Sequence, residues 1–133
     1  MRKPLLMALL LGCAASAAGE TPRKKPATVA SWYGEEHRGK LMANGHRFDP
    51  DKMTAASWFY PLGTQVKVTV NSSVYRNSTP PSVLVTITDR GPARQLVRNG
   101  RKIDLAHAAF KALADPDAGL IEVTIARITG EKM

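Results

Sequence analysis

An acidic residue, Asp89, ends the alternating β-branched run of segment 86–92 (TITDRGP) and is followed at once by Arg90 and a Gly-Pro turn signal. A carboxylic acid in a partly dehydrated groove keeps its proton longer than one in water, and it can donate that proton to a leaving oxygen. If the strand stays extended, Asp89 and Arg90 point to opposite faces, so Arg90 does not neutralise its neighbour directly. Asp89 is therefore a candidate general acid, and the alternative is an Asx-type turn before Gly91 and Pro92.

The other acidic candidates, Asp49, Asp51 and Asp104, stand where structural roles are expected. Asp49 precedes Pro50 in segment 48–57 (FDPDKMTAAS), a pattern typical of a helix start, and Asp51 is then a favourable charge in the first turn. Asp104 precedes a stretch whose apolar residues recur at helical spacing. We therefore expect Asp49 and Asp104 to cap short helices.

The histidines, His37, His46 and His107, are not spaced as metal ligands, and His107 is expected to be packed or solvated within the last helix. The chain has no phosphate-binding glycine loop, no G-x-S-x-G elbow and no H-E-x-x-H pair. The sequence gives no support for nucleotide, esterase or zinc-protease chemistry, and we expect neither a metal nor a cofactor.

The N-terminus has the order of a secretory signal: two basic residues, an apolar run and then small residues. The apolar run is too short to span a bilayer as a mature helix. Two ways of processing fit residues 1–19: cleavage at an Ala-x-Ala-like site near Ala17 or Ala18, or lipid attachment at Cys13 in LLGC. Cys13 is the only cysteine, so no internal disulfide can form.

The segment that follows, 20–28, combines prolines with consecutive basic residues and is expected to be an extended tether. Removing Arg2 and Lys3 with the leader lowers Lys plus Arg from 19 to 17 against 11 Asp plus Glu, which leaves a net charge of +6. A basic exported domain suits an anionic envelope polymer or a lipid surface. Nucleic acid is not expected as a partner, because export separates the protein from the nucleic acid of the cytoplasm. In addition, no predicted helix carries a basic stripe beside aromatic residues.

The folded domain is expected over residues 29–129 and is rich in strands. Alternating apolar residues predict strands at 29–34, 64–70, 82–88 and 119–128, with a long hairpin loop over 71–82. Turn signals are too frequent for a repeated βαβ layout. Several short strands with few helices favour a small closed β-barrel, whose closure hides the sheet edges.

Six motifs occur in an order and spacing that resemble one known family. They are ASWYG at 30–34, ANGHRFD at 43–49, MTAAS at 53–57, PLGTQVKVT at 61–69, TDRGP at 88–92 and IDLAHAA at 103–109. In them the chain resembles the rare lipoprotein A family, whose domain is related to those of expansins and barwin. The resemblance implies a mainly β fold, a six-stranded double-psi β-barrel with one or two short helices.

The same resemblance implies an endolytic peptidoglycan lytic transglycosylase that acts on glycan strands stripped of stem peptides. Such enzymes cleave between N-acetylmuramic acid and N-acetylglucosamine and leave a 1,6-anhydro end. Hydrolysis normally uses two carboxylates, whereas here the sugar's own C6 hydroxyl attacks, so one residue that donates and then accepts a proton suffices. The resemblance also implies export to the periplasm or outer membrane of a bacterium, a membrane anchor through Cys13 and candidate partners in cell division.

The resemblance further implies three active positions, at which typical members have Glu, His and Asp. This chain has His46, Ser57 and Asp89 there, so it keeps only the last. His46 can exchange protons near neutral pH and Ser57 can hydrogen-bond a sugar hydroxyl, but neither supplies the carboxylate charge that steadies an oxocarbenium-like centre.

Substrate contacts are expected from Asn44, Arg47 and Arg90, which hold sugar and acidic groups, and from Tyr33. Tyr33 is a candidate for stacking on sugar rings, as are Trp32 and Trp58, with a core role as the alternative. Two functions stay open at this point: a transglycosylase, or a module that binds peptidoglycan or loosens the wall as expansins do without cleaving it.

Overall fold

The structure is a computed structural model, and it describes residues 27–128 of the 133-residue chain. The predicted leader, Cys13 and most of the predicted tether lie outside the described residues. Within 27–128 no helix has both the length and the apolar character needed to cross a membrane.

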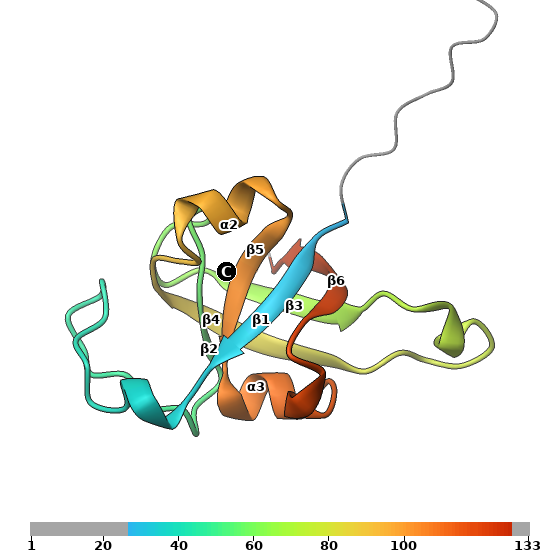
Figure 1. The fold of residues 1–133 in the computed structure, drawn as a ribbon, viewed down its shortest axis with the longest axis horizontal. Helices are drawn as coiled ribbons and strands as arrows, with labels where there is room; N and C mark the ends of the chain where they lie inside the picture. Colours follow the sequence, from blue (N-terminus) through green and yellow to red (C-terminus); the bar gives the residue numbers. More distant parts are fainter. Residues whose placement is uncertain (1–26, 129–133) are drawn as a thin grey trace, which may run out of the picture.

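Six strands form one closed barrel with the neighbour order β1-β5-β2-β4-β3-β6 (Figure 1). The strands are β1 (Val29–Tyr33), β2 (Thr54–Ala56), β3 (Gln65–Val70), β4 (Ser82–Asp89), β5 (Arg101–Ala106) and β6 (Ile121–Arg127). The β1·β5 and β2·β4 pairs are parallel, and the other pairs are antiparallel. The predicted fold class, a six-stranded double-psi barrel with short helices, is confirmed.

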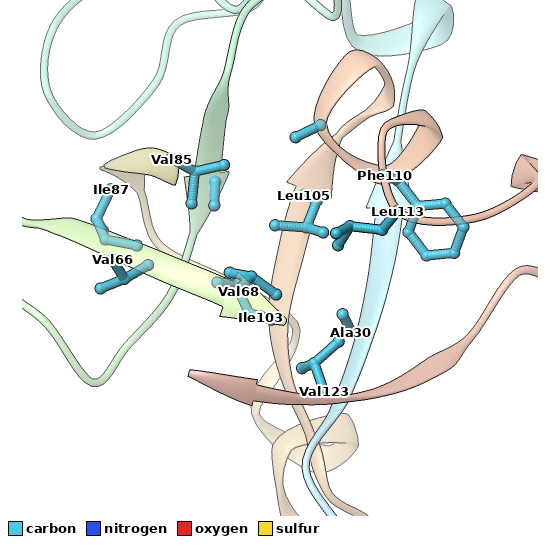
Figure 2. Packing of buried hydrophobic residues seen from close by; sticks show 12 residues of the cluster. Ala30, Val66, Val68, Val85, Ile87, Ile103, Leu105, Phe110, Leu113 and Val123 are labelled. Atoms are coloured by element: carbon cyan, nitrogen blue, oxygen red, sulfur yellow. The ribbon is translucent and has the colours of Figure 1, made fainter. Parts of the chain in front are cut away.

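The barrel interior is filled by side chains that alternate along the strands (Figure 2). Val66 of β3 lies opposite Val85 of β4, and these two, Val68 of β3 and Ile87 of β4 are all at most 1% exposed. Every second side chain of a strand points inward. Burying each of these side chains away from water stabilises the fold by about 1.5–3 kcal/mol. The strands predicted at 64–70 and 82–88 are therefore β3 and β4, joined by the long hairpin loop as expected.

The helix predicted over 48–57 is wrong. Asp49 accepts a hydrogen bond from the backbone N–H of Asp51 at 2.9 Å, which makes an Asx turn instead of a helix cap. Thr54–Ala56 then forms β2, which lies between β4 and β5. The small Ala55 and Ala56 side chains are buried there, so tertiary pairing overrides the local helix signal.

The predicted capping role of Asp104 is also wrong, because Asp104 lies inside β5. Its neighbours Ile103 and Leu105 are fully buried, and Asp104 points to the other face of the strand. The helix α3 (His107–Lys111) begins only afterwards, and His107 packs against Trp32 with ring centroids 4.8 Å apart.

The remaining elements are short helices and 3-10 turns in the connections between the strands (Figure 1). The helices α2 (Arg94–Arg98) and α3 precede and follow β5, so they lie at opposite ends of that strand. The 3-10 turn η2 (Ser73–Tyr75) sits in the β3–β4 loop, which projects from the barrel on the side away from α2. Two further 3-10 turns, η1 (Glu35–His37) and η3 (Pro116–Ala118), follow β1 and α3.

Candidate active site

A hollow of about 440 Å³, here called the acidic hollow, opens where residues from four strands meet. Tyr33 ends β1, Ala56 ends β2 and Asp89 ends β4, while Arg101 and Asp104 come from β5. The rest of its lining is Trp32, Glu36, His37, Arg90, Gly91, Pro92 and Ala93. Two carboxylates from different strands therefore share one concave surface.

The carboxyl group of Asp89 is oriented by main-chain donors. Its Oδ1 accepts hydrogen bonds from the N–H of Ala43 at 2.9 Å and from that of Arg90 at 2.8 Å. In the described part of the chain, Oδ2 accepts no such bond, so one carboxyl oxygen is left for a ligand. Backbone donors hold a side chain without long flexible partners, which favours a fixed acid.

The loop before β2 brings Ala43 to Asp89. A bridge between Leu41 and Arg47 closes it, and the N–H of Asn44 donates to the carbonyl of Thr88 at 3.2 Å. Gly45 forms the tip at φ 90°, a conformation that glycine adopts without steric cost. The ANG motif therefore positions the acid through its backbone.

Asp104 is the second carboxylate; it is an acidic candidate in the sequence, where the pattern favours a helix cap for it. The Ser31 hydroxyl, 2% exposed, donates to its Oδ1, and Nε of Arg101 donates to the Ser31 hydroxyl at 2.7 Å. Arg101 also lies 3.7 Å from Oδ1 of Asp104. The alternation of Ile103 and Leu105 is the sequence signal that places Asp104 on a strand face.

Tyr33 lies beside both acids. Its ring stacks on Phe48 with centroids 4.3 Å apart, and its hydroxyl is buried without a hydrogen-bond partner among the described residues. Burial, and after it the charges of Asp89 and Asp104, raise the pKa of the Tyr33 phenol above its ordinary value. Tyr33 therefore keeps its proton at neutral pH.

Arg90 lines the acidic hollow, but its guanidinium is engaged within the protein. One nitrogen donates to the carbonyl of Ser57 at 2.8 Å and to that of Tyr60 at 2.6 Å. The side chain thus fixes the turn after β2 and forms no ion pair with Asp89 within residues 27–128. This placement favours a positioning role for Arg90 over contact with a sugar.

Ser57 is 1% exposed and lines neither this hollow nor the next. Its hydroxyl accepts from the N–H of Phe59 at 3.0 Å, and its own N–H donates to the carbonyl of Asp89 at 3.0 Å. This burial does not favour direct contact between Ser57 and a glycan.

The remaining predicted site residues, Asn44, His46 and Arg47, line a separate hollow of about 350 Å³ together with Thr88. Thr88 lines this second hollow and its neighbour Asp89 lines the acidic hollow, so both hollows adjoin the end of β4, where the pairing with β2 shifts register. Arg47 donates to the carbonyl of Gly39 at 3.1 Å. Tyr33, Asp89 and Arg90 therefore line one hollow, and His46 lines the other.

The two tryptophans that are candidates for stacking on sugar rings, Trp32 and Trp58, differ in exposure. The indole N–H of Trp32 donates to the carbonyl of Pro116 at 2.9 Å, and its ring packs on the core beside Phe110. Trp58 is 41% exposed. Within residues 27–128, no three His, Cys, Asp or Glu side chains gather as metal ligands would.

A closed mixed barrel of six strands with two parallel pairs places the chain in the class of double-psi β-barrel proteins. The family model described as lytic transglycolase matches residues 25–125. The chain belongs to this lytic transglycolase family and is an RlpA-like double-psi β-barrel.

Curated relatives agree with the family. The chain is 39% identical over 108 residues to a probable endolytic peptidoglycan transglycosylase RlpA of Synechocystis, covering 81% of this chain and 30% of the relative. It is 38% identical to the endolytic peptidoglycan transglycosylase RlpA of Vibrio cholerae, covering 77% and 35%. The chain therefore spans about a third of the length of these two relatives. It also matches 98% of an uncharacterized Synechocystis protein at 36% identity, over 77% of its own length.

Solved structures share the fold. A Streptomyces papain inhibitor superposes with a TM-score of 0.56 at 22% identity, over 83% of this chain and all of the inhibitor. A mutant expansin of Clavibacter michiganensis, in complex with cellohexaose, superposes with a TM-score of 0.55 at 20% identity, over 81% of this chain and 52% of the expansin. At such identities the likeness concerns the fold alone.

Proposed function

We propose that this chain is an endolytic peptidoglycan lytic transglycosylase that cleaves stem-peptide-free glycan strands and leaves 1,6-anhydro-N-acetylmuramic acid ends. The observation that carries the proposal is Asp89, held on Oδ1 by the N–H groups of Ala43 and Arg90 at the edge of the acidic hollow. Membership of the lytic transglycolase family supports the same chemistry.

In the proposed reaction, protonated Asp89 gives its proton to the glycosidic oxygen as the bond from that oxygen to C1 of the muramic acid breaks. The C6 hydroxyl of the same sugar then bonds to C1 and returns a proton to Asp89. No water is consumed, and one carboxyl group serves as acid and then as base.

The positive charge that develops on the sugar ring needs a nearby negative group. Asp104 can supply it, because its carboxylate lines the same hollow and is held by Ser31. Tyr33 lines the same hollow, and its ring stacks on Phe48. Asn44, His46 and Arg47 are proposed to bind a neighbouring part of the strand from the second hollow.

The proposal includes a location. A chain that acts on peptidoglycan works outside the cytoplasm, which agrees with the secretory pattern of residues 1–19. We propose export to the periplasm or outer membrane, with lipid attachment at Cys13, and proteins of cell division as candidate partners.

The test is digestion of denuded sacculi with purified protein, with anhydro ends scored by mass spectrometry. Wild type is expected to release them, and Asp89→Asn to release at least about a hundredfold fewer, because a general acid is lost. Asp117→Asn is the matched control, since Asp117 is exposed and lines neither hollow. Absence of anhydro ends with wild type, or equal release by Asp89→Asn, would contradict the proposal.

A binding role without cleavage is the second candidate, and the replacement of two expected active residues by His46 and Ser57 favours it. In that case wild type and Asp89→Asn are retained equally on sacculi, retention weakens with salt, and neither releases anhydro ends. Failure to sediment with sacculi would exclude it.

A further inference from the structure

Two large aromatic side chains stand exposed on the turn after β2, and one of them contacts a residue that lines the acidic hollow. Trp58 is 41% exposed and Phe59 is 53% exposed. The indole N–H of Trp58 donates to the carbonyl of Pro92 at 2.7 Å, and Pro92 lines the acidic hollow. The Trp58 ring therefore lies next to a residue that lines the acidic hollow.

Each of these rings is paired with a cation. The Arg94 guanidinium lies 4.5 Å from the centre of the Trp58 ring, and the Lys102 ammonium lies 5.6 Å from that of Phe59. Arg98 lines a hollow of about 500 Å³ together with Trp58, Phe59 and Arg94. In the described part of the chain, none of the three cations has a carboxylate within ion-pair distance.

The turn that carries the rings is fixed before any ligand arrives. The Ser57 hydroxyl accepts from the N–H of Phe59, and Arg90 holds the carbonyls of Ser57 and Tyr60. A preorganised aromatic surface loses little conformational entropy on binding. Exposed Trp and Phe rings held in this way are typical of a binding surface.

We infer that Trp58, Phe59, Arg94, Arg98 and Lys102, here called the aromatic-cationic platform, form a second glycan subsite that selects sugars carrying a carboxylate. The inference rests on the proposed function, because the platform continues the surface on which Asp89 lies. The C–H face of a pyranose packs on an aromatic ring, and an arginine takes a carboxylate through paired hydrogen bonds.

This chemistry distinguishes muramic acid from neutral sugars. Each N-acetylmuramic acid carries an ether-linked lactyl carboxylate next to its ring, so it offers both an apolar face and an anion. Chitin oligomers offer the face alone. The platform therefore gives the chain a preference for peptidoglycan glycan over chitin that the acidic hollow does not by itself provide.

The experiment measures, by calorimetry, the affinity of purified Asp89→Asn protein for a glycan hexasaccharide from denuded peptidoglycan and for chitohexaose. This variant is used because it is expected to bind the glycan without cleaving it. Adding Arg94→Gln and Arg98→Gln is expected to weaken the muramic ligand about tenfold and to leave chitohexaose unchanged. Trp58→Ala is expected to weaken both. Arg76→Gln is the matched control, because Arg76 is exposed in the β3–β4 loop, on the side of the barrel away from α2.

The inference would be overturned if the double arginine variant bound the muramic ligand as tightly as the Asp89→Asn protein does. It would also be overturned if the Asp89→Asn protein bound the two ligands equally. If Trp58→Ala fails to fold, Trp58→Phe keeps the ring and is expected to retain binding. The exposed arginines on α2 allow the charge test in either case.

A separate arm tests an anionic lipid as the occupant, using phosphatidylglycerol vesicles. If the arginine variant loses vesicle binding and keeps the muramic ligand, the surface is a lipid site and the inference is wrong. The proposed function fails separately: if wild type releases no anhydro ends while the platform still prefers the muramic ligand, cleavage is disproved and the subsite stands.

Discussion

The backbone N–H of Ala43 donates a 2.9 Å hydrogen bond to Oδ1 of Asp89, which lies 46 residues further along the chain. The candidate acid is thus positioned by a loop that precedes β2 as well as by the strand that carries it. Changes in that loop are therefore expected to alter the chemistry without touching an acidic residue.

Gly45→Ala tests this dependence. Gly45 has φ 90°, and nothing lies within 4 Å of an added Cβ, so the cost is backbone strain alone, about 1–2 kcal/mol. We expect lower stability together with slower release of anhydro ends. Gly119→Ala is the control, since Gly119 has φ 73° and equally open surroundings but lies after η3. Equal loss of activity in both variants would show that the loop has no special role.

Asp104→Asn tests the second carboxylate. An asparagine can still accept the hydrogen bond from Ser31, but it lacks the negative charge that pairs with Arg101. We therefore expect the free energy of unfolding to fall by about 1–3 kcal/mol. If Asp104 steadies charge on the sugar, kcat falls while KM changes little. Denaturant unfolding and initial rates measure the two effects. Unchanged kcat at full folding would limit Asp104 to a structural role.

Tyr33→Phe tests the raised phenol pKa through alkaline stability. The folded protein keeps the Tyr33 proton where the unfolded chain loses it, above the ordinary pKa near 10. This contribution is complete below about pH 10 and is lost as the pH rises further, because the unfolded state then binds fewer protons. We expect the variant's free energy of unfolding to fall less than that of wild type between about pH 9 and about pH 11.

The control for that measurement is Tyr75→Phe, because Tyr75 lies in the β3–β4 loop rather than in the acidic hollow. Its pH dependence should match that of wild type. Identical alkaline slopes for wild type and Tyr33→Phe would mean that Tyr33 titrates alike in the folded and unfolded states.

Arg90→Lys tests whether Arg90 positions the turn or binds substrate. A lysine keeps the charge but does not reproduce the planar guanidinium that bonds the carbonyls of Ser57 and Tyr60. We expect a stability loss of about 1–3 kcal/mol, measured by thermal or denaturant unfolding. A variant with wild-type stability and weakened glycan binding would instead assign Arg90 to the substrate.

The strands of the central hairpin could be predicted from sequence because β-branched residues alternate over long runs. Val66 and Val68 of β3 and Val85 and Ile87 of β4 are all buried, and the pattern alone indicates both strands and their buried faces. The strand β2 (Thr54–Ala56) could not be predicted in this way, since three residues carry too little alternation and its neighbours supply the pairing.

Site residues that act through their side chains could be predicted from the sequence, whereas residues that act through backbone groups could not. Asp89 stands out at the end of its strand, but every non-proline residue has an N–H, so nothing in the sequence marks Ala43 as its donor. Asp104 was assigned to a helix because β5 runs directly into the alanine-rich start of α3. The alternation of Ile103 and Leu105 indicates its strand face, but only the pairing of β5 with β1 and β2 shows which residues share that face.

The strand order also governs when the molecule can fold. Among the barrel's neighbouring pairs, only β3 and β4 are consecutive in the chain, and β1 lies between β5 and β6. The strand β1, which leaves the ribosome first, can pair only after β5 and β6 have been synthesised. The barrel therefore closes after synthesis is complete, and its non-local strand pairing is slow. If the leader directs export, the chain remains unfolded and able to pass through a translocation channel for as long as β6 is missing.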